Sequence, residues 1–131
     1  NPALYAKLPY DPVRDFAPVT LVGSQPYMLI VHPSVPARSV AELVKLARRA
    51  PEQISFSHTG AGSATHLAGA LFEGTAGVKL LAVPYKSPVH LTAVMSGEVA
   101  VAMLSLPIAY AWNALWSGRS VLQPMKIGRR H

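Results

Sequence analysis

Short apolar runs alternate with amphipathic stretches through most of the chain. The continuous apolar run at 27–32 predicts a strand covered on both faces, and the stretches 53–57, 79–85 and 99–105 predict three further strands. Helical spacing predicts four helices, which begin near Ser39, Ser63, Ser87 and Pro107 and end near Pro51, Gly74, Gly97 and Gly118. This alternation predicts an α/β fold, a parallel sheet with helices on both faces.

The spacing of apolar residues also predicts which side of each helix faces the core. Ser39 and Glu42 form a capping box at the start of the first helix. The expected core-facing residues are Val40, Leu43, Val44 and Ala47 in the first helix, Leu67, Ala68, Leu71 and Phe72 in the second, Leu91, Val94 and Met95 in the third, and Ile108, Ala111, Trp112 and Leu115 in the fourth.

Residues 1–26 differ from the rest because they hold five of the twelve prolines, Pro2, Pro9, Pro12, Pro18 and Pro26. Proline lacks an amide donor and blocks helix interiors, so we expect an extended arm.

Composition narrows the function classes. The net charge of +6 raises the question of nucleic acid, but the lysines and arginines are scattered, which favours a solvated surface over a phosphate-binding stripe. The chain has no cysteine, so neither disulfides nor thiolate chemistry is expected.

The stretch SFSHTGAGSATHLAG, residues 55–69, is the strongest candidate site. Gly60 and Gly62 allow a sharp turn, and a helix beginning near Ser63 would point unpaired amides from Thr59 to Ala64 at an anion. Right-handed crossovers would bring this loop to the same sheet edge as the loops at 85–87 and 105–107. A tight strand-to-helix turn without a ligand explains the glycines equally well.

The identity of such an anion can be narrowed by motif. A triphosphate loop needs a lysine directly after its glycines, and none follows before Lys79. A dinucleotide site needs a third glycine where Thr65 stands, and an acidic residue after the next strand, which is absent. A carboxylate needs only amides and hydroxyls, which Thr59, Ser63 and Thr65 can supply.

Two other kinds of site are conceivable at the same edge, a metal site and a Ser/His nucleophile pair. His58 and His66 lack a third ligand at metal-site spacing, so no metal and no cofactor are expected. Ser57 or Ser105 with His66 could form a nucleophile pair in an α/β enzyme, but no nucleophile elbow or orienting carboxylate accompanies them. The residues alone therefore favour a carboxylate-binding module and leave a Ser/His α/β enzyme as an alternative.

Several stretches together resemble a known family: NPALYAKLPYDPVRDFAPVT, VHPSVPARSVAELVKLAR, SFSHTGAGSATHLAGALFEGTAGV, AVPYKS and SGEVAVAML. They are similar to the Bug-type solute receptors, the extracytoplasmic binding proteins of tripartite tricarboxylate transporters. The resemblance implies one lobe of a two-lobed type II periplasmic binding protein, which captures small carboxylates without metal. It implies an extended interlobe arm at 1–26, an α/β ligand-binding lobe at 27–123 and a basic tail at 124–131.

The resemblance also implies a ligand site, partners and a compartment. The matching loops nominate His58, Thr59, Gly60, Ala61, Gly62, Ser63, Tyr85 and Lys86 as ligand-binding residues. The implied partners are a small carboxylate and the membrane permease subunits, and the implied location is the periplasm, with the leader absent from this chain. We also expect a homodimer through the arm and 27–31, since one lobe leaves apolar surface uncovered.

The sequence departs from the family in ways that bear on ligand choice. The first lobe's share of the cleft is not present, and Ala100, Leu104 and Ser105 stand where an acidic residue or asparagine is common in the family. An effector-binding regulatory lobe would share the fold and remains the alternative to a transport receptor.

Overall fold

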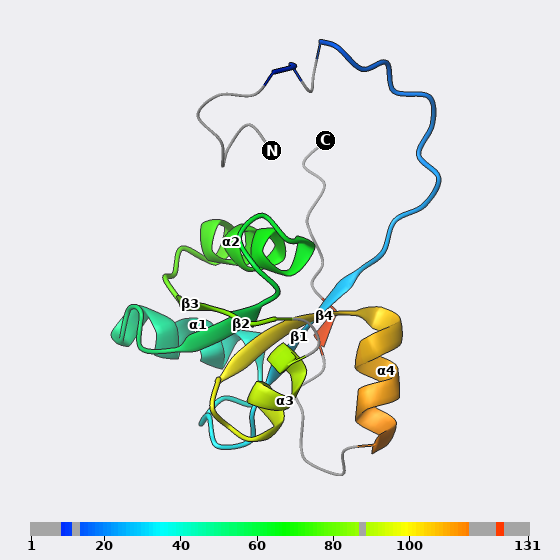
Figure 1. Ribbon diagram of the computed structural model, residues 1–131. Helices are drawn as coiled ribbons and strands as arrows, with labels where there is room; N and C mark the ends of the chain where they lie inside the picture. The colour runs from blue at the N-terminus through cyan, green and yellow to red at the C-terminus, as the bar shows by residue number, and fades with distance from the viewer. Residues whose placement is uncertain (1–8, 12–13, 87–88, 116–122, 125–131) are drawn as a thin grey trace.

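Five strands form one mixed sheet in the order β3-β2-β4-β1-β5, with helices on both faces (Figure 1). The computed structural model describes residues 9–11, 14–86, 89–115 and 123–124. The strands are β1 (Tyr27–Val31), β2 (Ser55–His58), β3 (Leu81–Pro84), β4 (Val101–Ser105) and β5 (Gln123–Pro124), and the helices are α1 (Val40–Arg49), α2 (Ala64–Ala76), α3 (Val89–Met95) and α4 (Leu106–Leu115). The α/β class and the four predicted strands and helices are confirmed.

The direction of β1 is the main correction to the expected sheet. β2 pairs parallel with β3 and with β4, as predicted, but β1 pairs antiparallel with β4, so that Tyr27 lies opposite Ser105. The start of β1 therefore lies at the sheet edge where β2, β3 and β4 end. The Leu106 amide, which donates to the Pro26 carbonyl at 3.2 Å, ties the entering chain to this edge.

One face of the sheet is covered by α1 and α2. Residues alternate along the central strands, so Leu29, Val31, Phe56 and Met103 pack on this side against Leu43 of α1 and Phe72 of α2. Ser39 caps α1 by accepting from the Glu42 amide at 3.2 Å, and the Glu42 carboxylate accepts from the Arg38 amide at 2.6 Å. The capping box is thus formed with its second bond one residue earlier than expected.

The opposite face is covered by α3 and α4. Met28, Ile30, Ala102 and Leu104 pack there against Ala93, Val94 and Ala109. Because both faces of β1 and β4 are buried, these strands are continuous apolar runs in the sequence.

In three helices the apolar spacing predicted the core-facing side only in part: Ala68, Phe72 and Val94 are buried as expected, but other predicted residues are exposed. In α2, Ala68, Gly69 and Phe72 are buried, whereas Leu67 and Leu71 are exposed. In α3, His90, Ala93 and Val94 are buried and Met95 is exposed, and in α4, Ala109 is buried while Ile108 and Ala111 are exposed. Small residues carry the close contacts in these helices, so counting large apolar residues misplaced their inner faces. The predicted caps at Ser87 and Pro88, the side chains of Trp112 and Leu115, and Gly118 lie outside the described residues.

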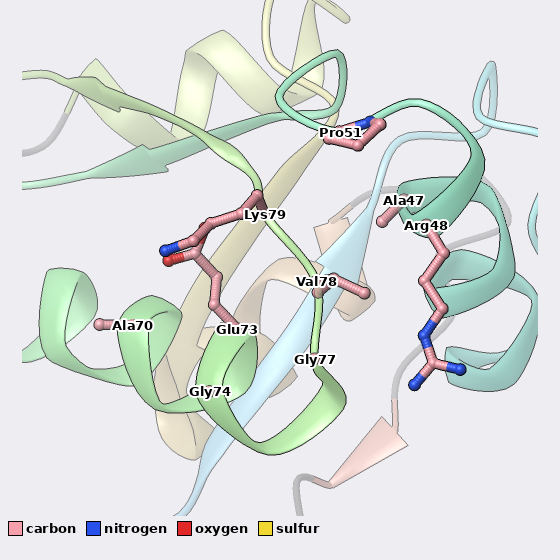
Figure 2. A pocket seen from close by; sticks show the side chains of 9 residues that line it. All are labelled: Ala47, Arg48, Pro51, Ala70, Glu73, Gly74, Gly77, Val78 and Lys79. Atoms are coloured by element: carbon pink, nitrogen blue, oxygen red, sulfur yellow. The ribbon is translucent and has the colours of Figure 1, made fainter.

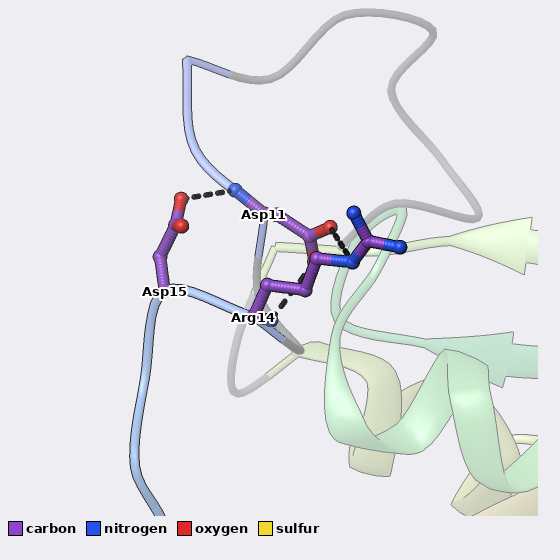
Figure 3. Close-up of polar contacts among 3 residues, drawn as sticks. All are labelled: Asp11, Arg14 and Asp15. Carbon is purple, nitrogen blue, oxygen red and sulfur yellow. Dashed lines mark hydrogen bonds and ion pairs between the residues drawn. The ribbon is translucent and has the colours of Figure 1, made fainter.

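The described part of the arm runs outside the body (Figure 1). Residues 14–26 form no helix or strand and are exposed, with Val19 95% and Val22 96% accessible. The described part of the arm contains a local turn. The Asp15 amide donates to the Asp11 carbonyl and the Asp11 amide donates to the Asp15 carboxylate, while the Asp11 carboxylate also binds Arg14 (Figure 3). Tyr10 and Phe16 pack edge to face across this turn, with ring centroids 5.6 Å apart. The expected exposure of 27–31 is wrong, because these residues form β1, an inner strand between β4 and β5 whose residues are mostly buried.

Candidate functional site

The loops after β2, β3 and β4 leave the sheet at one edge, as the crossover rule predicts. The Tyr85 amide donates to the His58 carbonyl at 2.8 Å, which joins the ends of β2 and β3 directly. The glycine loop 59–63 follows β2 and leads into α2, whose N-cap is Ser63. This edge therefore brings His58, the glycine loop, Tyr85 and Ser105 into one region.

A hydroxyl cluster holds the glycine loop against the first turn of α2. Thr65 Oγ1 accepts from the Thr59 amide at 3.1 Å and lies 3.2 Å from Thr59 Oγ1 and 3.0 Å from Ser63 Oγ. Ser63 Oγ also accepts from the His66 amide at 3.2 Å, which satisfies one of the unpaired donors of the helix start. Three hydroxyl groups thus lie together at the place where the sequence predicted that a ligand carboxylate binds.

The loop amides are less available than the sequence suggested. The amides of Gly60 and Gly62 donate to the Nδ1 atoms of His58 and His66, both at 3.1 Å. The Thr59 amide donates to Thr65 Oγ1 and the Ser63 amide to the Gly60 carbonyl. The prediction of a cradle made of six free amides is therefore wrong for this conformation. Within the described residues, the amides of Ala61 and Ala64 have no acceptor.

The rings of His58 and His66 lie against each other, with centroids 4.5 Å apart and planes inclined at 32°. His58 is buried and also packs on the Phe56 ring at 5.6 Å. Burial lowers the pKa of His58; the hydrogen bond with the Gly60 backbone acts against this shift, and the neighbouring His66 adds to it. The net effect favours a neutral His58 ring beside the loop.

Tyr85 and Lys86 contribute differently from the expectation. The Tyr85 hydroxyl donates to Glu98 Oε1 at 2.9 Å, so its phenol is held by Glu98 and only its backbone joins the glycine loop. Burial, and then the Glu98 carboxylate, raises the pKa of Tyr85. Lys86 is exposed next to this edge and has no ion pair among the described side chains.

The nucleophile pairs considered from sequence do not form in the described structure. Ser57 is fully buried on the α3 side, where its hydroxyl donates to the His90 carbonyl at 3.2 Å. Neither His58 nor His66 is bonded to a carboxylate of a described residue. No group of three histidine, aspartate or glutamate side chains able to hold a metal occurs among the described residues.

An apolar groove of about 290 Å³ adjoins the glycine loop. It lies between the end of the arm and the outer side of α2 and is lined by Gln25, Pro26, Tyr27, Ala64, Leu67, Ala68 and Leu71. The sequence analysis missed this feature because it assigned Leu67 and Leu71 to the core. The antiparallel direction of β1 places Tyr27 at this edge.

A larger groove of about 580 Å³ lies at the other end of α2, away from the candidate site (Figure 2). Its lining residues come from α1 and the turn after it, from α2, and from the segment between α2 and β3, and they include Arg48, Glu73 and Lys79. Arg48 donates to the Ala76 carbonyl at 2.8 Å and Glu73 accepts from the Leu80 amide at 2.6 Å. These side chains thus close the C-terminal end of α2.

The sequence profile of the tripartite tricarboxylate transporter family receptors, called TctC, matches residues 1–119. The chain belongs to this family. The resemblance stated from sequence is confirmed, and no described helix has the length and apolar character of a bilayer span.

Among individual proteins, the chain is 42% identical over 82 residues to the UPF0065 protein in the tcbD-tcbE intergenic region of Pseudomonas sp. strain P51, which covers 63% of this chain and 24% of that protein. It is 28% identical over 106 residues to protein BugT of Bordetella pertussis, covering 80% of this chain and 32% of BugT. The chain therefore spans only about a quarter to a third of the length of these relatives.

Solved structures agree with the fold. The R. palustris protein Rpa4515 with adipate superposes with a TM-score of 0.68 at 33% identity, over 93% of this chain and 40% of that one. MatC (Rpa3494) from Rhodopseudomonas palustris with bound malate gives a TM-score of 0.70 at 26% identity, over 92% and 40%. The expected periplasmic binding protein fold is confirmed.

Proposed function

We propose that this chain is the ligand-binding lobe of a solute receptor that recognises a small carboxylate for a tripartite tricarboxylate transporter. The observation that carries the proposal is the family match over residues 1–119, together with a glycine loop that gathers hydroxyls at the sheet edge. Adipate and malate, the ligands of the two solved relatives, are both dicarboxylates. The proposed role is binding without chemical change.

The proposed ligand site combines the loop after β2 with the loop after β3. We assign it to His58, Thr59, Gly60, Ala61, Gly62, Ser63, Tyr85 and Lys86. A carboxylate accepts hydrogen bonds only, so the Thr59 and Ser63 hydroxyls and the Ala61 amide suit it as donors. Lys86 adds the positive charge, and Tyr85 supports His58 through its backbone.

The apolar groove beside this loop suits the carbon chain of a dicarboxylate. Ala64 lies directly after the loop and also lines the groove, so a ligand held at the loop can extend along α2 toward Leu67. Burial of methylene groups there contributes roughly 0.8 kcal/mol per group. Adipate, with four methylene groups, should therefore bind more tightly than malate.

Calorimetric titration of the chain with adipate tests this function, with the uncharged diamide of adipate as a matched probe. We expect heat of binding for adipate and none for the diamide, because the loop donors and Lys86 select an anionic oxygen. Lys86→Gln should weaken adipate binding, whereas Lys79→Gln, at the distant groove, should leave it unchanged. Equal binding of adipate and its diamide would contradict carboxylate recognition.

The remaining partners follow from the family and belong to the same proposal. A receptor of this kind delivers its ligand to membrane permease subunits from the periplasm. We further propose that the isolated chain forms a homodimer through the arm, because Val19, Leu21 and Val22 are exposed there and the groove beside Leu67 and Leu71 is apolar.

Light scattering tests the dimer over a range of protein concentrations. A mass that rises toward two chains, and that falls back to one when Val19 and Val22 are changed to serine, is the expected result. A single-chain mass at every concentration would refute the pairing.

A further inference from the structure

His58 and His66 both accept a hydrogen bond from the backbone of the glycine loop. His58 ends β2 and His66 lies in the first turn of α2, and each accepts a hydrogen bond through Nδ1 from a glycine amide of the loop between them. The sequence separations are short, two residues from His58 to Gly60 and four from Gly62 to His66. The loop is thus held at both ends by imidazole acceptors.

These two bonds fix the tautomer of both rings. A backbone N–H can only donate, so Nδ1 of each ring must carry its lone pair and the ring proton must lie on Nε2. A ring that accepts through Nδ1 is neutral, because an imidazolium has a proton on both nitrogens. The Gly60 and Gly62 bonds therefore exist only while the rings are neutral.

Protonation would break both bonds and would also set two positive charges side by side. The ring centroids are 4.5 Å apart, a distance at which two imidazolium ions repel. The other titratable groups nearby are Tyr85, whose hydroxyl is bonded to Glu98, and the exposed Lys86. Neither α1 nor the described arm gives either ring a hydrogen bond or an ion pair, and β2 contributes the uncharged Phe56 ring. No described carboxylate offsets the charge.

An anion would change this balance. Released from Nδ1, the amides of Gly60 and Gly62 become donors for a carboxylate, and the two imidazolium rings supply the charge that such a ligand needs. The ligand oxygen and the Nδ1 atoms therefore compete for the same two amides. Protonation of the two rings and binding of a carboxylate therefore favour each other. The neutral rings favour the loop in which the Gly60 and Gly62 amides are bonded to Nδ1.

We propose that His58 and His66 act as a proton-controlled clamp, which holds the glycine loop closed when neutral and frees the amides of Gly60 and Gly62 for a carboxylate when protonated. The ligand half of this inference rests on the proposed function, whereas the clamp itself does not. Because coupling is reciprocal, carboxylate binding should then take up protons.

Nuclear magnetic resonance of the chain without ligand tests the clamp. Long-range nitrogen spectra should report the Nε2–H tautomer for His58 and His66 at neutral pH. As the pH falls through the histidine range, amide-exchange protection at Gly60 and Gly62 should drop by up to about tenfold per pH unit. Protection of the Gly77 amide, which donates to the Glu73 carbonyl at the other end of α2, should not follow.

A conservative variant separates the clamp from a merely structural role. Asparagine places an acceptor oxygen near the position of Nδ1 but does not titrate in this range, so His66→Asn should keep Gly62 protected at every pH. His32 also accepts a backbone amide through Nδ1, that of Ser34 at 3.2 Å, but follows the far end of β1. His32→Asn should therefore leave the pH response of Gly60 and Gly62 intact.

The ligand half is tested by adipate titration in two buffers of different ionisation enthalpy. Tighter binding at lower pH and an observed heat that depends on the buffer, showing proton uptake, would support the inference. Adipate binding without proton uptake would overturn the coupling and leave the proposed function standing. Unchanged protection at Gly60 and Gly62 while both rings titrate, or an Nδ1–H tautomer, would overturn the clamp whether or not adipate binds.

Discussion

The two ends of α2 satisfy the hydrogen-bonding groups of their backbone with different partners. At its start, the loop donors are taken by the Ser63 hydroxyl, the Thr65 hydroxyl and two neutral imidazoles. At its end, Gly77 turns the chain with a φ of 63°, Arg48 binds the Ala76 carbonyl and Glu73 binds the Leu80 amide.

This difference fits the binding role that we propose for the start of α2 and a structural role for its end. The partners at the start are uncharged acceptors that an anionic oxygen could replace, because hydroxyls rotate and imidazoles titrate. The partners at the end are a guanidinium and a carboxylate, each already bonded to backbone. Although the groove there is larger, its Arg48 and Glu73 side chains already bind backbone groups at the end of the helix.

The largest effect on stability is expected for a substitution in the middle of α2. There the helix packs on the sheet through a contact that holds both of its ends in place. A Cβ on Gly69 would collide with the Phe56 ring, whereas Gly74 has open space around it. Gly69→Ala should destabilise the fold by about 1–3 kcal/mol through overpacking. Gly74→Ala should stabilise it by about 0.5–1 kcal/mol through helix propensity. Urea unfolding of both variants measures the contrast, and a stabilised Gly69→Ala would contradict this packing.

A smaller effect separates the two ends directly. Gly62 and Gly77 have φ of 77° and 63°, a region where a Cβ costs about 1–2 kcal/mol. Gly62→Ala and Gly77→Ala should lower stability by similar amounts, but only Gly62→Ala should weaken adipate binding. Unfolding and calorimetry on the same samples distinguish them, and equal loss of adipate binding in both would erase the functional difference between the ends.

The smallest effect is a pH dependence of stability. Burial lowers the pKa of His58 and of His90, whose Nδ1 has no partner among the described residues. The unfolded chain then binds more protons in acid, so stability is full above the ordinary histidine value of about 6.5 and falls as the pH drops toward the lowered folded pKa values. Urea midpoints that decline on acidification, and decline less in His90→Leu, are expected. A midpoint that rises in acid would contradict neutral buried rings.

The sequence predicted the element order well because buried strands and capped helices have local signals. The capping box of Ser39 and Glu42 predicted the start of α1, and the apolar runs predicted β1 and β4. The direction of β1 has no such signal, since a strand buried on both faces looks the same whichever way its neighbour runs. Its pairing with β4 is set by residues seventy or more positions away.

The glycine loop between β2 and α2 was predicted in position, but the hydrogen bonds of its amides were not. The glycines located the loop, yet free amides were assumed although His58 and His66 stand two and four residues away, within reach of them. The inner face of α2 was misplaced because the helix is apolar on most sides, and Gly69 marks the true contact better than Leu67 or Leu71. Close approach by a small residue is a tertiary property that spacing does not encode.

Chemical-shift mapping with adipate tests the central claim most directly, because it asks which end of α2 the ligand meets. The account predicts saturable shifts at the amides of Thr59, Gly60, Ala61, Gly62 and Ser63 and at Lys86, with Arg48, Glu73 and Gly77 unmoved. Shifts centred on the groove at Arg48 and Lys79, with a silent glycine loop, would contradict it.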